Sequence, residues 1–115
     1  MTHTYSNGVG EWDVPRLWAL ASDLPVVEQA PERFLEWHMP EFGPTWMMLS
    51  SMAEYAVHVR RILDADLSYP VIVSAEGHIM DGNHRLIKAW LEGVPVKKVC
   101  FLKTPAPDRL VGDSA

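Results

Sequence analysis

The stretch Asp81-Gly82-Asn83-His84-Arg85-Leu86 lies where a short apolar run gives way to a helical pattern of residues. Residues 70–74 and 77–81 read as two strands, and the glycine-ended connection 75–77 predicts that they form a β-hairpin. After the stretch, apolar residues recur at the spacing of one helix face, and they are Leu86, Ile87, Trp90 and Leu91. The sequence therefore predicts a sharp turn from a hairpin into an amphipathic helix.

Both ends of this helix are marked in the sequence, and its first turn suits an anion. Asn83 is a favourable N-cap residue, and Gly93 is a favourable residue just after the last turn. The first turn of a helix points free N–H groups outward, and Gly82 allows a ligand to approach the backbone closely. Arg85 and Lys88 stand one turn apart and add positive charge. These features predict a phosphate site.

The same residues also have a purely structural interpretation. Asp-Gly-Asn is a frequent tight-turn sequence, in which the side chain of Asp81 accepts a hydrogen bond from the backbone two residues later. The six residues alone leave both interpretations open.

Residues 52–102 resemble the ParB/sulfiredoxin-like superfamily in the order and spacing of their features. A hairpin, a Gly-x-His-Arg turn from Gly82 to Arg85, a helix, Gly93 and a further strand follow one another. In that superfamily a Gly-x-x-Arg or Gly-x-His-Arg turn opens a helix, and members that bind nucleotides hold the phosphates with it. The resemblance implies a ParB/sulfiredoxin-like domain that binds a nucleoside triphosphate, ATP or CTP. We expect Mg²⁺ with it, because Asp81 beside a phosphate site would repel a bare polyanion but could help to hold one that carries a divalent cation.

The resemblance and the residue types together imply roles around the turn. The residues expected to bind the nucleotide are Gly82, Asn83, His84, Arg85 and Lys88. Gly82 and Asn83 would offer backbone donors, while His84 and Arg85 would clamp phosphate oxygens. Asp81 would orient magnesium or accept a proton. Because phosphoryl transfer depends on positioning and charge stabilisation, the candidate catalytic residues are Asp81, His84 and Arg85.

Two departures from the superfamily narrow the expected activity. Sulfiredoxins carry a catalytic cysteine immediately before the His-Arg pair, and Asn83 stands there in this chain, so the nucleophile for that chemistry is missing. Partition-type ParB proteins continue with DNA-binding and dimerisation segments, and only residues 103–115 follow here. The form Asp-Gly-x-His-Arg is similar instead to small free-standing members, which include an archaeal free-serine kinase. We therefore expect a small-molecule phosphotransferase or a slow NTPase.

Length, composition and charge define the class of protein. The 115 residues fit one domain, with 1–10 and 104–115 expected to be flexible. Apolar residues make up 48% and charged residues 22%, which is ordinary for a globular protein. The sequence has neither an apolar run long enough for a membrane span nor a signal-peptide pattern, so we expect a cytoplasmic location. A net charge of −5 argues against general nucleic-acid binding and a ParB-like nuclease.

The order of predicted elements indicates an α+β domain with a small mixed β-sheet and packed helices. Short helices are expected at 13–22 and 31–38. A longer helix follows Ser51, because Ser51 and Glu54 form a capping-box signature, and its apolar stripe should pack on the sheet. Residues 96–102 read as a strand that runs parallel to the second hairpin strand after the crossover helix.

Residues 39–44 are irregular, because two prolines and a glycine break any periodic pattern. Loops on a rigid scaffold often carry binding groups, so His38 and Glu41 are candidate substrate-binding residues, with either as a general base. The alternative is that the aromatic residues around this loop form a satellite of the core.

A different class of function is also compatible with the sequence. The chain could be a non-catalytic module that binds a protein partner or a second copy of itself, or that uses a nucleotide only as a switch. Residues 1–50 hold two basic and seven acidic residues, so they contribute the whole charge of −5. In this alternative, the acidic first half and the aromatic loop would form the contact surface.

Overall fold

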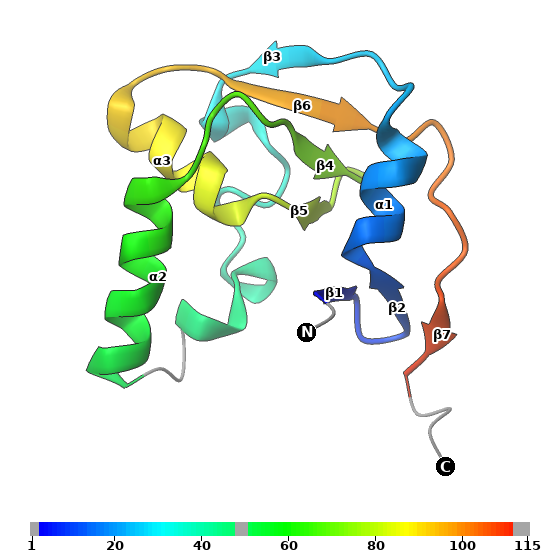
Figure 1. Cartoon of the computed structure of the whole chain (residues 1–115), viewed down its shortest axis with the longest axis horizontal. Helices are drawn as coiled ribbons and strands as arrows, with labels where there is room; N and C mark the ends of the chain where they lie inside the picture. The colour runs from blue at the N-terminus through cyan, green and yellow to red at the C-terminus, as the bar shows by residue number, and fades with distance from the viewer. Residues whose placement is uncertain (1–2, 48–50, 112–115) are drawn as a thin grey trace.

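The computed structural model describes residues 3–47 and 51–111, which form an α+β fold with two sheets and three α-helices (Figure 1). The helices are α1 (Val14–Ala21), α2 (Met52–Asp64) and α3 (Asn83–Glu92), and single 3-10 turns are η1 (Pro31–Arg33), η2 (Pro40–Phe42) and η3 (Thr45–Met47). The strands are β1 (Thr4–Ser6), β2 (Gly10–Asp13), β3 (Val27–Gln29), β4 (Val71–Val73), β5 (Ile79–Asp81), β6 (Val96–Cys100) and β7 (Arg109–Leu110). None of the helices in the described ranges is long and apolar enough to cross a membrane.

The main sheet has the strand order β3-β6-β4-β5, with β4 and β6 parallel and the other pairs antiparallel. The predicted hairpin is confirmed as β4 and β5. The expectation that residues 96–102 run parallel to the second hairpin strand is wrong, because β6 pairs with β4 instead. All three residues of β4 are buried, so this strand takes the centre of the sheet, and β6 occupies the side that β5 leaves free.

Two cores lie on opposite faces of this sheet, because successive residues of β4 point to opposite sides. Ile72 and Val99 pack with Leu17 of α1, which covers one face (Figure 1). Val71 and Val73 pack with Leu86 of α3, which covers the other. The buried residues of α3 are Leu86 and Ala89, while Trp90 is 48% exposed and Leu91 is 59% exposed. The apolar face predicted for this helix is therefore only partly buried.

Helix α2 begins as predicted but packs differently. The Ser51 side chain accepts a hydrogen bond from the Glu54 N–H at 3.1 Å, which confirms the cap. The expectation that the apolar stripe packs on the sheet is wrong: Ile62 is the buried residue of α2, while Met52 is 91% exposed and Leu63 is 55% exposed. Since α1 and α3 already cover the sheet, α2 lies against α3 and η3 (Figure 1).

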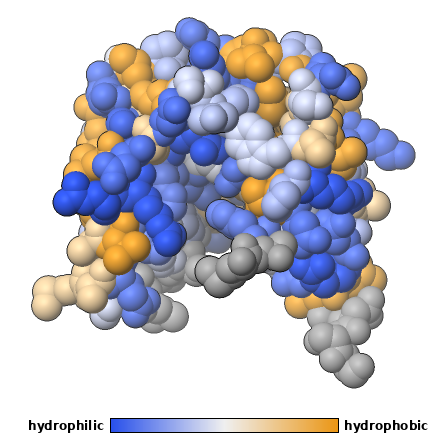
Figure 2. Space-filling model, viewed as in Figure 1, coloured by the Kyte–Doolittle hydropathy of each residue, from blue (hydrophilic) through white to orange (hydrophobic). Residues whose placement is uncertain are grey.

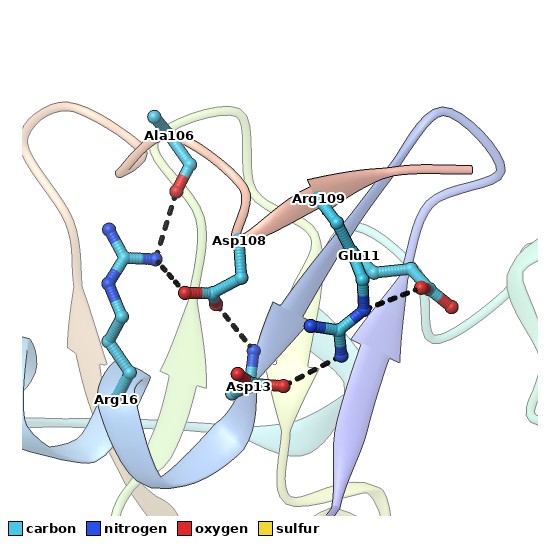
Figure 3. A network of polar contacts seen from close by, with 6 residues as sticks. All are labelled: Glu11, Asp13, Arg16, Ala106, Asp108 and Arg109. Carbon is cyan, nitrogen blue, oxygen red and sulfur yellow. Dashed lines mark hydrogen bonds and ion pairs between the residues drawn. The ribbon is translucent and has the colours of Figure 1, made fainter. Parts of the chain in front are cut away.

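A second, three-stranded sheet has the order β1-β2-β7 and is antiparallel throughout. Residues 1–10 and 104–115 were expected to be flexible, but their described parts supply β1 and β7. Charged groups tie this sheet to α1 (Figure 3): Arg109 bonds Glu11 and Asp13, and Asp108 pairs with Arg16 at 3.2 Å. Cross-strand ion pairs and backbone pairing thus fix segments that have few apolar residues of their own.

The first half of the chain is less helical than predicted. Helix α1 ends at Ala21, close to the expected end. The prediction of a helix at 31–38 is wrong. Only the single turn η1 forms there, and Phe34 already adopts an extended conformation. Residues 39–44 are irregular as predicted apart from η2, whose turn begins at Pro40.

Candidate ligand site at the start of helix α3

The turn before α3 is built around a left-handed glycine. Gly82 has φ +115° and occupies the N-cap position, so the prediction of Asn83 as the N-cap is wrong by one residue. A Cβ at Gly82 would lie 3.1 Å from the Cα of Val71 and 3.0 Å from Nη2 of Arg85. Only glycine avoids both the conformational strain and this crowding. Gly93 ends the helix at φ +69°, as expected for a C-terminal glycine.

Asp81 and Arg85 bind each other and the first helix. Oδ2 of Asp81 accepts a hydrogen bond from Nε1 of Trp18 at 2.8 Å and lies 3.2 Å from Nη2 of Arg85. The guanidinium of Arg85 also lies over the Trp18 ring. Both charged side chains are more than four-fifths buried. Among the described side chains, Nε of Arg85 is the buried nitrogen without a hydrogen-bond partner. This cluster joins the start of α3 to α1.

His84 and Lys88 are directed instead toward α2. Nε2 of His84 lies 3.0 Å from Nδ1 of His58, and Nζ of Lys88 donates to the carbonyl oxygen of Ala65 at 2.7 Å, just after the last residue of α2. Burial lowers the pKa of His84, and the nearby His58, Arg61 and Arg85 lower it further. The predicted phosphate ligands therefore separate into one group facing α1 and another facing α2.

Two adjoining cavities, of about 520 Å³ and 540 Å³, lie beneath residues 36–47. Asn83, the first residue of α3, lines both of them, as do Glu36 and Phe42. Of the two predicted substrate-binding residues, Glu41 lines the first cavity and His38 lines the second. Asp81, Gly82, His84, Arg85 and Lys88 are not among the described lining residues of either cavity.

Glu36 organises the first cavity, and sequence analysis missed it. Its Oε1 accepts the N–H of Ile79 at 3.0 Å, and its Oε2 lies 2.8 Å from Nδ1 of His78. The side chain is 9% exposed. In the helix predicted at 31–38, Glu36 would be an ordinary polar residue, so that prediction did not single it out. No local pattern signals its partners, which are more than forty residues away in the chain.

The first cavity carries negative charge. Glu36, Glu41 and Glu76 line it together with Tyr5, and its described lining contains no lysine or arginine. Burial raises the pKa of Tyr5 to about 12, and the charges of Glu36 and Glu76 act in the same direction. The phenol of Tyr5 therefore stays protonated and can donate a hydrogen bond at neutral pH.

The second cavity is mainly apolar, with walls that include Trp37, Met47 and Leu86. The joined volume can thus hold an organic group at one end and hydrogen-bond donors or positive charge at the other. Within the described residues, no group of three or more His, Cys, Asp or Glu side chains is arranged to hold a metal ion. Oδ2 of Asp81, the predicted magnesium ligand, is engaged by Trp18 and Arg85.

The resemblance to the ParB/sulfiredoxin-like superfamily stays a prediction from residues 52–102. Comparison of the chain with protein-family models, with curated proteins and with solved structures found no match in any of the three.

Proposed function

We propose that the chain is a small ParB/sulfiredoxin-like domain that binds a nucleoside triphosphate, ATP or CTP, in the joined cavity beneath residues 36–47. The observation that carries this proposal is the position of Asn83, which is both the first residue of α3 and part of both cavity walls. A helix N-terminus attracts phosphate through its free N–H groups. Here it meets a volume within the usual range for small-molecule sites.

The order of elements also supports the proposal. A hairpin, a left-handed glycine, a helix and a strand parallel to the first hairpin strand succeed one another between Val71 and Cys100. This order agrees with the turn-and-helix arrangement that the resemblance implies. Asn83 would then present its backbone donor to the phosphates, and Gly82, which is not among the described lining residues, would do so only after the turn rearranges.

Charge sets a condition on nucleotide binding. The described lining of the first cavity is acidic, so a bare triphosphate would be repelled, and binding should require the magnesium complex. The apolar second cavity suits the nucleobase. Arg85 would join the phosphates only by exchanging its contact with Asp81, and His84 only by leaving His58. Both residues therefore act in this proposal after ligand-induced rearrangement.

A site that binds the triphosphate in this way would also be able to catalyse phosphoryl transfer. An acceptor hydroxyl in the first cavity would attack the γ-phosphorus, its proton would pass to the exposed carboxylate of Glu41, and the nucleoside diphosphate would leave. His38, which lines the second cavity, is the alternative base. Without an acceptor, water in the same position would give slow hydrolysis.

The test is calorimetric titration with ATP, CTP, GTP and UTP in the presence of Mg²⁺. Asn83→Asp keeps the side-chain shape but adds a negative charge to the cavity wall, and an aspartate in the first turn does not weaken the helix. We expect this variant to bind the triphosphate roughly tenfold or more weakly, which corresponds to about 1.4 kcal/mol.

Gln29→Glu is the matched control, because it adds the same charge on β3, where Gln29 bonds Lys98. It should bind as the native chain does. The native chain failing to bind any of the four nucleotides, with its fold intact, would contradict the proposal. Equal weakening in both variants would indicate a general charge effect and no site at α3. Arg85→Ala is less suitable because it breaks the contact with Asp81.

A second candidate is a non-catalytic protein-interaction module, favoured by the exposed apolar stripe of α2. Met52, Val59 and Leu63 share one helix face and are 91%, 37% and 55% exposed. Orange and tan residues are visible on the surface over α2 in Figure 2. Sedimentation over a wide concentration range would test self-association through this face. A native dimer that Leu63→Glu abolishes would favour this candidate, and a monomer at every concentration would count against self-association.

A further inference from the structure

Three aromatic rings form a stack at the junction of η3, α2 and α3. The Trp46 and His58 ring centres are 4.4 Å apart with planes inclined by 5°. The His58 and His84 rings are 5.3 Å apart at 24°. Because Nδ1 of His58 lies 3.0 Å from Nε2 of His84, one ring must donate its N–H to a bare nitrogen of the other. The junction therefore requires at least one neutral imidazole.

The surroundings of this pair do not favour a second proton. Arg61 of α2 and Arg85 of α3 lie near His84, and Asp81 of β5 is the acidic group that acts on it. Trp46 of η3, which also stacks with Tyr55 of α2, adds no titratable charge. Burial and the three basic neighbours lower the pKa of His84. In an unfolded or detached segment the imidazole would return to its ordinary value of 6.5.

Within the described residues, α2 is also held by the contact of Tyr55 with Trp46 and by two contacts near its C-terminal end. Ile62 is its buried residue, and Lys88 reaches the carbonyl of Ala65 just beyond its last turn. The histidine pair therefore supplies much of the contact between the middle of α2 and the start of α3. Trp46 lies in the same stack, next to Met47, which lines the second cavity.

We propose that His58 and His84 form a proton-operated latch, which holds α2 and η3 against α3 when the pair has a neutral ring and releases them when both rings are protonated. Release occurs below pH 6.5, because in that range the detached imidazole of His84 binds a proton that the closed junction resists. Stability of the closed junction is complete above this pH and falls as the pH is lowered. Movement of Trp46 would carry Met47 and open the cavity wall.

The effect on ligand access rests on the function proposed above, but the latch itself does not, so it is tested without nucleotide. Hydrogen exchange of backbone amides, corrected for the intrinsic effect of pH, should be followed from about pH 7.5 to 5.5. We expect the opening constant of α2 to rise by up to tenfold per pH unit below 6.5 for one proton taken up. Amides of β4 and β6 should keep their protection.

His58→Phe keeps a flat ring for Trp46 but cannot be protonated, so it should reduce the pH dependence of α2 exchange, while burial, Arg61 and Arg85 still act on His84. His58→Gln keeps a hydrogen-bonding partner for His84 and should do the same if the phenylalanine variant does not fold. His3→Phe, at an exposed position away from the junction, is the matched control and should behave as the native chain does.

Proton NMR titration of the histidine rings supplies the second readout. We expect the His84 resonance in the native chain to titrate below its ordinary pKa and to move toward it in the His58 variants, because His58 is one of the groups that lower it. An unchanged pH dependence of α2 exchange in both His58 variants would overturn the latch. Protection of α2 that stays constant down to pH 5.5 would overturn it as well.

Discussion

The guanidinium carbon of Arg85 lies 5.4 Å from the ring centre of Trp18, so the first turn of α3 is fastened to α1 across the edge of the main sheet. The same indole donates a hydrogen bond to Asp81, which also binds Arg85. A motif that looked like a phosphate clamp is thus, in the ligand-free chain, a contact between segments more than sixty residues apart.

Arg85→Ala should destabilise the fold even without any ligand. It leaves Asp81, whose side chain is 17% exposed, without its cationic partner. Removal of one partner from such a charge pair costs about 2–3 kcal/mol. Urea denaturation would measure the change, with Arg33→Ala on the exposed turn η1 as the control. A stability equal to that of the control would show that the Asp81–Arg85 contact contributes little.

Gly82→Ala and Gly93→Ala should separate backbone strain from crowding. Both glycines have positive φ, so each substitution costs about 1–2 kcal/mol in backbone strain. A Cβ at Gly93 has no atom within 4 Å, whereas at Gly82 it meets Val71 and Arg85. Crowding in a packed site adds about 1–3 kcal/mol, so Gly82→Ala should be clearly the less stable variant in thermal unfolding. Equal melting temperatures would contradict the geometry of this turn.

Tyr5 should make stability fall at alkaline pH. Burial, with the charges of Glu36 and Glu76, raises its pKa to about 12 from 10.0. Between these values the unfolded chain loses a proton that the folded chain keeps, so stability is complete below pH 10 and falls as the pH rises toward 12. Ultraviolet titration of the phenolate would detect the late titration of Tyr5. Glu36→Gln should lower its pKa, and an unchanged value would exclude a contribution from Glu36.

Asp108 should stabilise the small sheet except at acidic pH. The N–H of Asp13 and the neighbouring Arg16 lower the pKa of this carboxyl. Its contribution is therefore present above the ordinary value of 3.8 and is lost as the pH falls through the lowered pKa. Asp108→Asn should weaken the hydrogen bond of Val111 to Val9, which hydrogen exchange reads directly. Asp23→Asn, on the loop after α1, should leave that amide unchanged.

Local sequence patterns predicted the elements that are determined by interactions between residues close together in the chain. The capping box at Ser51, the buried run from Val71 to Val73 and the two glycines around α3 each act within a few residues, and each was found near its expected place. The placement of α2 depends on which other helices cover the two faces of the main sheet. Periodicity identifies an apolar stripe, but it does not say what covers that stripe.

The candidate site was harder to predict because its contacts join distant parts of the chain. Asp81, Arg85, His84 and Lys88 look like one group in the sequence, yet they turn toward different helices. Asn83 faces the cavities, which were not evident from any pattern. Nucleotide and magnesium binding, the acceptor, the partners and the ParB/sulfiredoxin-like kinship are still predictions that the experiments above address.

Glu36 also pairs with a backbone N–H on the last strand of the main sheet. Strand β5 is at the end of the main sheet, where an unpaired amide could recruit a strand from another molecule. The carboxylate of Glu36 takes the N–H of Ile79 and places charge beside that edge. A continuous sheet between molecules would have to displace this group first. Glu36, which lines the cavity, thus also opposes the pairing of β5 with a strand of another molecule. A change at Glu36 would alter solubility as well as binding.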